Sequence, residues 1–449
     1  MKVSFYTLGC KLNYSETSTI SNQFLEAGHT IVPFGDDSDC LIINTCSVTE
    51  NADTEARKII RRTLRKSPNT YVGITGCYAQ LQPEEIASID GVDAVFGTKE
   101  KFSILESLST FEKESIPKIY VSDLDETPDF NDSFSSDTDS RTRAFLKIQD
   151  GCNYNCSFCT IPIARGGSRS MPFEKILTKM EEIEKSGYNE IVLTGINLGD
   201  YSYDEFRFID VVRLIDSSAI QARIRISSIE PNLLTNEIIN VVLNSKKFCN
   251  HFHIPLQSGS SEILGKMKRR YKVSQYQELI LSIKQMDMNT CIGVDVIVGF
   301  PGETNDKFEE TFHFLESLPI SYLHVFTYSE RENTPAKEFK DSVPYSTRKL
   351  RTARLRQLSE FKKNEFYKSQ LGQKRIVIPE KFDSSLERWT GYSNNYVKVQ
   401  FNAPVNLIQK SSVVLLNSIE GNNVQSTLES LHLSENIEYQ KQYIPILLS

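Results

Sequence analysis

The stretch LKIQDGCNYNCSFCTIP, residues 146–162, begins as an apolar segment and continues into a loop with three cysteines. Cys152, Cys156 and Cys159 have the spacing CxxxCxxC, which is rare by chance in a chain with nine cysteines among 449 residues. Three thiolates on one loop can bind three irons of a four-iron cluster and leave the fourth iron open to a small chelating molecule. A structural zinc site is the alternative, but it normally takes four protein ligands, and no fourth Cys or His lies nearby in the sequence.

The segment that opens this stretch is the first of six apolar runs that alternate with helix-like sequence. Such alternation predicts parallel βα units, and six of them predict an incomplete barrel within residues 142–370. A long charged helix is expected from Ser346 to about Ser369 at its end. The six expected strands cover residues 144–149, 190–194, 223–227, 251–255, 292–298 and 321–326.

Residues 1–110 show a similar alternation, which predicts an open parallel α/β domain. Its expected strands are 3–8, 41–44, 71–75 and 94–96, with helices at 16–27 and 52–66. Residues 111–141 are expected to form an acidic linker, because Asp123 to Asp139 contains seven acidic residues and no Lys or Arg. Residues 371–449 carry short alternating runs separated by Gly and Asn, which predict a small all-β barrel.

A second set of cysteines follows the strands of the amino-terminal domain. Cys10, Cys46 and Cys77 each lie just past the carboxyl end of an expected parallel strand. Ligands bind at that edge of open α/β sheets, so these three thiols can converge on a second metal site. A single cysteine at such a position is more often a buried core residue, and it is the repeated position after three strands that favours a metal site. Cys40, Cys249 and Cys291 have no spacing partners and are assigned to packing.

Composition and charge limit where the protein works and what it binds. With 51 basic and 58 acidic residues the net charge is −7, so the chain as a whole does not attract a polyanion, and any such site must be local. No stretch is apolar for the roughly 20 residues that a transmembrane helix needs, and the first residues lack a signal-peptide core. We therefore expect a cytoplasmic protein with reduced thiols and no membrane partner.

With these motifs in view, the chain resembles the methylthiotransferase branch of the radical S-adenosylmethionine enzymes over nearly its full length. Cys152, Cys156 and Cys159 align with that superfamily's cluster-binding motif, and the segments HIPLQSGS and DVIVGFPGET also look like family segments. The resemblance implies S-adenosylmethionine and two [4Fe-4S] clusters as cofactors, the second one held by Cys10, Cys46 and Cys77. Within this resemblance, residues 371–449 look like a TRAM domain, which is an RNA-binding module.

The residues around Cys10, GCKLNYSET, indicate a substrate. They look most like the enzymes that install a 2-methylthio group on N6-threonylcarbamoyladenosine next to the anticodon of tRNA. Relatives that act on isopentenyladenosine usually have Gln and Met after this cysteine, and relatives that act on a ribosomal protein usually have Pro and Lys. This chain has Lys11 and Leu12. The alternatives are another tRNA adenosine, a ribosomal protein, or a zinc-stabilised RNA-binding protein.

Four residues at the carboxyl ends of barrel strands are candidates for binding S-adenosylmethionine, because active sites of such barrels lie at that edge. They are Gly195, Glu230, Gln257 and Asp295. Gly195 would let the cofactor approach the backbone, and Glu230 could accept hydrogen bonds from ribose hydroxyls. An ordinary turn, a helix-starting acid and a structural acceptor are the alternative roles of Gly195, Glu230 and Asp295. His253 is expected to be an ordinary barrel residue.

Local basic groups are candidates for contacting the phosphates of a tRNA anticodon stem-loop. Arg57, Arg61 and Arg65 form one row of an expected helix, and a second group contains Arg348, Arg351 and Arg354. The carboxyl-terminal barrel is charge-balanced, so we expect it to contribute shape and stacking instead. Trp389, Tyr392, Tyr396 and Phe401 could stack on bases if exposed, although the barrel core is the default. The electron donor and the sulfur source are not encoded in these motifs.

Overall fold

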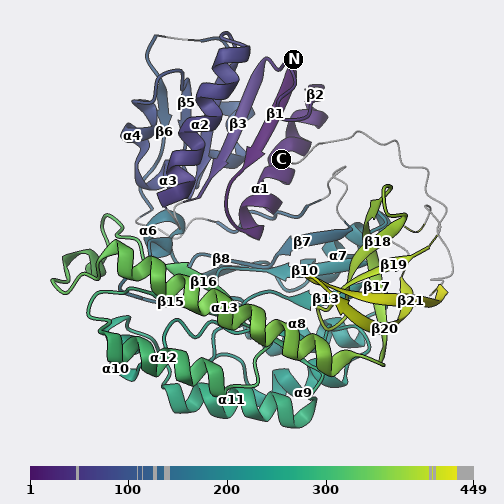
Figure 1. Cartoon of the computed structure of the whole chain (residues 1–449). Coiled ribbons are helices and arrows are strands. Elements are labelled where there is room, and N and C mark those ends of the chain that lie inside the picture. The colour runs from purple at the N-terminus through teal and green to yellow at the C-terminus, as the bar shows by residue number, and fades with distance from the viewer. Residues whose placement is uncertain are drawn as a thin grey trace.

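The computed structural model describes residues 1–46, 50–108, 110–113, 115–124, 129–135, 142–403, 407 and 411–431, with the side chains of 50–53 left aside (Figure 1). An amino-terminal sheet lies above a central set of parallel strands, and a small β-barrel lies at one end of it. The α/β class and the sequence of three folded parts are as expected. No helix within these ranges is long and apolar enough to cross a membrane.

The amino-terminal sheet has six parallel strands in the order β2-β1-β3-β4-β5-β6. Its central strands are buried along their full length because helices cover both faces, which explains their continuous apolar sequence. The strands are β1 (Lys2–Thr7), β2 (Thr30–Ile31), β3 (Cys40–Thr45), β4 (Tyr71–Gly76), β5 (Ala94–Phe96) and β6 (Lys118–Tyr120). The helices are α1 (Lys11–Glu26), α2 (Glu50–Lys66), α3 (Cys77–Leu81), α4 (Pro83–Ala87) and α5 (Ile104–Ser107), with a 3-10 turn at Glu100–Phe102.

The segment expected to be a linker is partly ordered structure. β6 lies within residues 111–141 and completes the sheet as its last strand. Farther along, Phe134 pairs with Leu146, and the backbone N–H of Lys147 donates to the carbonyl of Ser133 at 3.1 Å. Acidic composition indicated solvent exposure but not these backbone pairings. Residues 125–128 and 136–141 of the expected linker lie outside the described residues.

The central part has two three-stranded parallel sheets, β13-β10-β7 and β14-β15-β16. Isolated parallel bridges between Ile224 and Phe248 and between Ser228 and His253 connect them, which gives the six-stranded incomplete barrel expected from the sequence. The strands are β7 (Arg143–Lys147), β10 (Glu190–Thr194), β13 (Arg223–Ile226), β14 (His251–His253), β15 (Cys291–Val298) and β16 (Tyr322–Thr327).

Helices cover the outer face of these strands, and their apolar sides form the largest hydrophobic core. They are α7 (Lys175–Lys185), α8 (Phe208–Ser217), α9 (Asn236–Asn244), α10 (Ser261–Lys266), α11 (Val273–Met286) and α12 (Asn305–Ser317), with 3-10 turns at Leu198–Asp200 and Pro335–Glu338. The short helix α6 (Ile161–Arg165) lies instead against α3 of the amino-terminal domain. Short two-stranded pairs join β8 (Gln149–Asp150) to β9 (Arg169–Ser170) and β11 (Ser202–Tyr203) to β12 (Phe206–Arg207).

The expected long helix is α13 (Tyr345–Gln370), which runs along the central part and leads into the last one. There, five strands close into a barrel in the order β17-β18-β19-β21-β20. Trp389 and Phe401 are buried in its core, so they are not available for stacking on bases. The strands are β17 (Lys374–Asp383), β18 (Arg388–Ser393), β19 (Lys398–Asn402), β20 (Ser412–Glu420) and β21 (Asn423–Leu431).

Candidate functional site

The loop with Cys152, Cys156 and Cys159 follows β8 and is held by contacts at both ends. Gly151 has φ +67°, and a Cβ atom there would lie 2.0 Å from the carbonyl oxygen of Gly167, so only glycine fits. The N–H of Cys152 donates to the carbonyl of Gly166 at 3.1 Å. Farther along, the hydroxyl of Ser157 donates to the carbonyl of Lys266 at 2.8 Å. These contacts fix the loop before any ligand binds.

Donors already point at two of the three sulfurs. The N–H of Tyr154 donates to Sγ of Cys152 at 3.4 Å, and Nη1 of Arg269 donates to Sγ of Cys156 at 3.1 Å. Burial raises the pKa of Cys152 to about 11 and the pKa of Cys159 to about 12. Without a metal, these two thiols stay protonated at neutral pH. A bound metal centre would deprotonate them, so that they coordinate it as thiolates.

The spacing of the sulfurs matches a cluster better than a single zinc ion. Zinc–sulfur bonds of about 2.3 Å would bring tetrahedral thiolates to about 3.8 Å from one another. Among the described residues, neither cysteine set has three sulfurs that all lie within 4.8 Å of one another. A cluster places an iron at each thiolate and therefore separates the sulfurs more widely. The donors present fit the cluster that the sequence predicts.

Cys10, Cys46 and Cys77 lie at one edge of the amino-terminal sheet, since they follow the adjacent strands β1, β3 and β4. A Cβ atom at Gly9 would lie 2.6 Å from Cβ of Cys46, so the first two loops touch. At Gly76 a Cβ atom would lie 2.2 Å from the carbonyl oxygen of Thr45. Both glycines have left-handed φ values, +105° and +101°, and they allow the close approach of the three loops.

Beside this second cysteine set, a buried network of charges joins the two domains. Nη1 of Arg165 donates to Glu16 at 2.8 Å and to Asp150 at 3.0 Å, and its Nη2 donates to Asn13 at 2.8 Å. Lys101 donates to the same Glu16 carboxylate at 2.7 Å. Burial alone would raise the pKa of Glu16, but the neighbouring cations lower it to about 2. Arg165 also lies near the Cys77 thiol, so it links the docking of the domains to the cysteine site.

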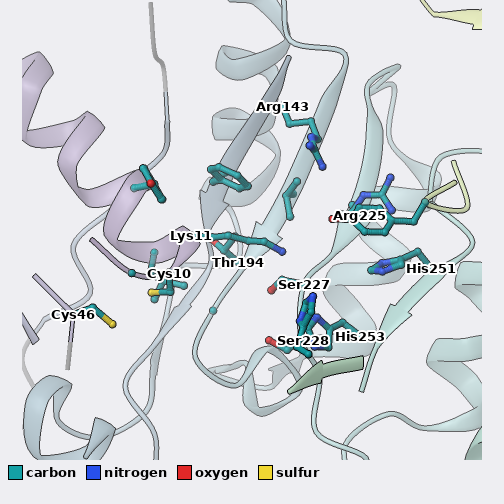
Figure 2. Close-up of a pocket in the computed structure, with 18 of the residues that line it drawn as sticks. Cys10, Lys11, Cys46, Arg143, Thr194, Arg225, Ser227, Ser228, His251 and His253 are labelled. Carbon is teal, nitrogen blue, oxygen red and sulfur yellow. The ribbon is translucent and has the colours of Figure 1, made fainter. Parts of the chain in front are cut away.

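A cavity of about 900 Å³ separates the amino-terminal domain from the interior of the barrel (Figure 2). Cys10 and Cys46 line it on one side, and Thr194, Gly195 and Ser227, at or just past the ends of β10 and β13, line it on the other. Two cysteines of the second set, Cys10 and Cys46, therefore share a cavity with the strand ends at which a barrel enzyme binds its substrates. A ligand in this cavity contacts both domains.

The four candidate cofactor residues lie in different surroundings. Gly195 lines the cavity, and a Cβ atom there would lie 2.9 Å from the Leu198 side chain and 3.0 Å from Oε1 of Gln149, so a larger residue does not fit. Glu230 is paired with Arg269 near the cysteine loop. Gln257 has φ +68° and pairs through its backbone with Val296 of β15.

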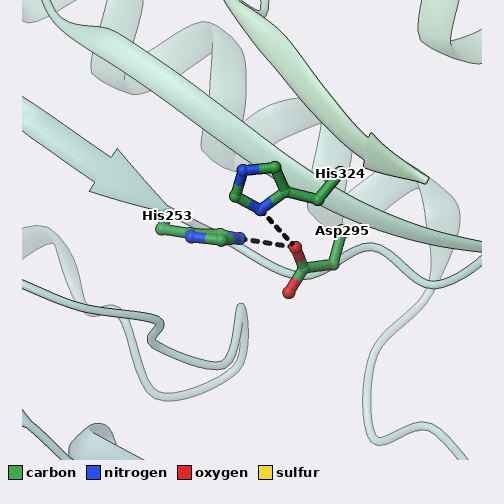
Figure 3. A group of neighbouring side chains, drawn as sticks. All are labelled: His253, Asp295 and His324. Atoms are coloured by element: carbon green, nitrogen blue, oxygen red, sulfur yellow. Dashed lines mark hydrogen bonds and ion pairs between the residues drawn. The ribbon is translucent and has the colours of Figure 1, made fainter. Parts of the chain in front are cut away.

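The fourth candidate, Asp295, accepts hydrogen bonds from two histidines (Figure 3). Nε2 of His253 lies 2.7 Å and Nδ1 of His324 lies 3.2 Å from the same carboxylate oxygen. Although burial opposes ionisation, the two imidazoles hold the pKa of Asp295 below its usual range. Asp295 thus acts as an acceptor for both histidines, which line the cavity, and its contact with S-adenosylmethionine stays a prediction. The interpretation of His253 as an ordinary barrel residue is thus incomplete.

The expected phosphate-binding rows differ in exposure. Arg57 on α2 donates to Glu85 at 2.6 Å. Arg61 and Arg65 are exposed, and they line a surface depression of about 670 Å³ whose lining side chains are all cationic. That depression is formed by Lys58, Arg61, Arg62, Arg65 and Lys66. The helix thus presents a concentrated positive surface, as expected.

The second row needs correction, because the structure buries two of its three arginines. Arg348 donates to Glu330 at 3.0 Å, and Arg351 donates to Glu303 at 2.7 Å. Both lie on the face of α13 that packs against the barrel, where they cannot contact RNA. Only Arg354 of this row remains at the surface, paired with Glu309 at 3.0 Å.

Sequence reasoning missed a group of polar residues inside the barrel. Arg225 on β13 is buried, donates to Glu190 at 2.7 Å and lies 4.8 Å from the ring centre of Tyr396, which reaches in from the last domain. Arg143 and His251 line the same cavity. A signal was available in β13, whose sequence RIRI alternates arginine with isoleucine, because alternate residues of a barrel strand point inward.

Two of the three domains match the profiles of known protein families. The radical SAM superfamily profile matches residues 146–315, and the profile described as uncharacterized protein family UPF0004 matches residues 2–97. Among solved structures, the chain has a TM-score of 0.54 to the radical S-adenosylmethionine methyltransferase TsrM from Kitasatospora setae. That match has 13% sequence identity and covers 75% of this chain and 74% of the other, so it concerns the fold alone.

Similarity to curated proteins extends over most of the chain. The threonylcarbamoyladenosine tRNA methylthiotransferase of Bacillus subtilis is 39% identical over 91% of this chain and 92% of its own length. The protein of the same name from Aquifex aeolicus is 37% identical over 85% of this chain and 93% of its own length. The tRNA-2-methylthio-N(6)-dimethylallyladenosine synthase of Fusobacterium nucleatum is 34% identical over 84% of this chain and 87% of its own length. On this similarity, the chain belongs to the methylthiotransferase family of radical S-adenosylmethionine enzymes, which use S-adenosylmethionine and [4Fe-4S] clusters.

Proposed function

We propose that this enzyme installs a 2-methylthio group on N6-threonylcarbamoyladenosine next to the anticodon of tRNA. The relatives that carry this activity in their names are 32–39% identical to the chain. A relative named for dimethylallyladenosine, at 34%, has similar identity, so overall similarity does not by itself select the substrate. Lys11 after Cys10 supports the threonylcarbamoyl substrate, in line with the family resemblance at that motif.

The observation that carries the proposal is the position of the second cysteine set. Cys10 and Cys46 line a cavity whose opposite wall is formed by barrel strand ends, among them Gly195. A methylthio transfer needs a sulfur source and a radical source on two sides of one substrate, and this cavity offers that arrangement. Cluster-bound cysteines elsewhere on the surface would not support it.

The bound cofactors would supply a 5′-deoxyadenosyl radical and a methylated sulfur. The residues of the chain bind and orient them. Cys152, Cys156 and Cys159 would hold three irons, and Arg269 would keep its hydrogen bond to the Cys156 sulfur. Cys10, Cys46 and Cys77 would hold the second cluster. The two domains line the cavity on opposite sides, so a bound substrate would contact both.

The tRNA would approach along α2. Arg61 and Arg65 form no ion pair with a carboxylate in the part of the chain that the structure describes, and Arg354 is a weaker candidate because Glu309 already neutralises it. Gln257 and Glu230 remain proposed contacts of S-adenosylmethionine on their positions after β14 and β13. We propose that the enzyme acts in the cytoplasm, as its tRNA substrate suggests.

Nucleoside mass spectrometry of tRNA from a deletion strain tests the proposal. We expect the 2-methylthio form of N6-threonylcarbamoyladenosine to disappear while the unmodified nucleoside accumulates. A plasmid copy should restore the product, and a copy with Cys156→Ala should not. An unchanged nucleoside profile in the deletion strain would contradict the proposal, and loss of the dimethylallyl product instead would reassign the substrate.

A further inference from the structure

The cavity between the domains has an excess of positive charge on its walls. Lys11, Arg143 and Arg225 all line it, and Figure 2 shows Lys11 extending from the Cys10 side toward the barrel residues. Among the described residues, Glu55 is the one acidic residue in the lining. Glu190 and Glu380 lie behind the wall, where they pair with Arg225 and Arg143. Among the three cations, Lys11 is thus the one without a carboxylate partner in the described part of the chain, whereas Arg225 and Arg143 each share one.

Several donors in this wall have no partner. Nη1 of Arg225 and Nδ1 of His251 are buried and have no hydrogen-bond partner in the described part of the chain. Both side chains are at most 4% exposed, so water does not satisfy them from outside. The Lys11 side chain is accessible from the cavity, and its ammonium makes no hydrogen bond or ion pair with the described residues. A carboxylate bound there would accept a charge-assisted hydrogen bond from Lys11.

The chemistry of the proposed substrate offers such an anion. A threonylcarbamoyl group on N6 carries a carboxylate, whereas a dimethylallyl group is apolar and uncharged. On adenine, N6 and the carbon C2 that receives sulfur flank N1 on one edge of the base. A residue that binds the N6 substituent must therefore lie next to the sulfur donor, and Lys11 follows Cys10 directly.

We infer that Lys11, Arg143 and Arg225 bind the carboxylate of the substrate's threonylcarbamoyl group and so select this substrate over adenosines with a neutral N6 substituent. The inference rests on the proposed function and names the residues that set its specificity. A neutral substituent would leave Lys11 without a partner, and sites built to bind a polar group reject analogues that lack it. Arg225 and Arg143 also contact Tyr396 and Tyr392, so the last domain helps to position them.

Binding of two synthetic anticodon stem-loops to the reconstituted holoenzyme tests the inference. Both carry the threonylcarbamoyl group, one with its free carboxylate and one as the methyl ester. Their phosphates are identical, so general electrostatic attraction cancels in the comparison. We expect the wild-type enzyme to bind the acid at least about tenfold more tightly than the ester. Equal affinities, or no binding of either, would overturn the inference without the need for any variant.

Two variants test whether Lys11 causes the preference for the acid. Lys11→Gln should reduce the preference for the acid about tenfold while its affinity for the ester and its iron content stay unchanged. Lys185→Gln, which removes the same charge from an exposed position on α7, should keep the full preference. A Lys11→Gln enzyme with the wild-type preference and full iron content would contradict the role of Lys11.

Product formation on the same stem-loops separates this inference from the proposed function. If the acid receives a methylthio group but both stem-loops bind alike, the proposed function holds and the carboxylate site is wrong. If the acid binds more tightly but neither stem-loop is modified, the carboxylate site holds and the proposed reaction is wrong.

Discussion

The two cysteine sets differ in how the chain builds them. Cys152, Cys156 and Cys159 lie on one loop, whereas Cys10, Cys46 and Cys77 come from three loops that only the parallel sheet brings together. The first set keeps its spacing as long as its loop is intact. The second set depends on strand order and on two glycines with left-handed φ values. The first site is thus a local property of the sequence, and the second is a property of the fold.

Each cysteine set also has one buried arginine beside it. One arginine pairs within its own domain, and the other pairs across the domain boundary. Arg269 contacts the Cys156 sulfur and pairs with Glu230 of the same domain. Arg165 belongs to the barrel domain but pairs with Glu16 of the amino-terminal domain, near Cys77. The barrel site is therefore supported from within its own domain, and the second site is supported across the domain boundary.

The largest expected effect separates the two sets by chemistry. Cys156→Ala should abolish both reductive cleavage of S-adenosylmethionine and product formation, since the cluster that cleaves it loses a ligand. Cys46→Ala should leave measurable 5′-deoxyadenosine while the methylthio product is lost. Chromatography of both products checks this, and Cys40→Ala, at the start of the strand that Cys46 follows, is the matched control, expected to retain both. Wild-type product formation by the Cys46 variant would show that the second set is not a catalytic site.

The next effect concerns the network that joins the domains. Arg165→Ala leaves Glu16 and Asp150 buried with fewer cations, and the loss of one partner from a buried ion pair costs about 3–5 kcal/mol of unfolding free energy. Arg269→Ala should cost less, because Glu230 keeps some solvent contact. Denaturant titrations of the two variants give the comparison. Equal losses would mean that both sites depend on the domain boundary to the same degree.

Acid should weaken the same network. The pKa of Glu16 is about 2 in the folded protein, below its ordinary value of 4.5, so ionised Glu16 stabilises the fold. This contribution, about 3 kcal/mol, is complete above pH 4.5 and is lost as the pH falls toward 2. Unfolding free energies measured at several pH values should therefore fall less steeply in Glu16→Gln than in the wild type. Parallel curves for the two proteins would contradict the assigned pKa.

A smaller effect tests the geometry of the second set alone. Gly9→Ala places a methyl group 2.6 Å from Cβ of Cys46 at a φ of +105°, and Gly28→Ala places one in open space at +84°. Both substitutions force alanine into a left-handed conformation, which costs about 1–2 kcal/mol, but only Gly9→Ala displaces a cysteine. Iron analysis should show a fall from about eight to about four irons per chain in Gly9→Ala and no fall in Gly28→Ala. Full iron content in both would mean that the contact between the loops is not needed for cluster binding.

The same contrast explains what the sequence could predict. The six barrel strands and the loop of Cys152 follow from local patterns, and the convergence of Cys10, Cys46 and Cys77 follows from the rule for parallel sheets. The burial of Arg348 and Arg351 could not be read from charge spacing, because it depends on carboxylates that the fold brings from distant segments. The cationic wall of the cavity was missed for the same reason, since three separate parts of the chain contribute to it.

The last and smallest effect tests on which side the tRNA approaches. α2 starts at the second cysteine set, where Glu55 lines the cavity, and its exposed Arg61 and Arg65 point to an approach over the amino-terminal domain. Arg61→Gln with Arg65→Gln should flatten the slope of log affinity against log salt, by up to about 0.9 per lost phosphate contact. Arg57→Gln should change the slope little, because Glu85 already neutralises that guanidinium. Arg354→Gln, on the barrel side, should also change it little. Filter binding at several salt concentrations measures all of these slopes, and a larger change in the Arg354 variant than in the α2 variant would place the tRNA on the barrel side instead.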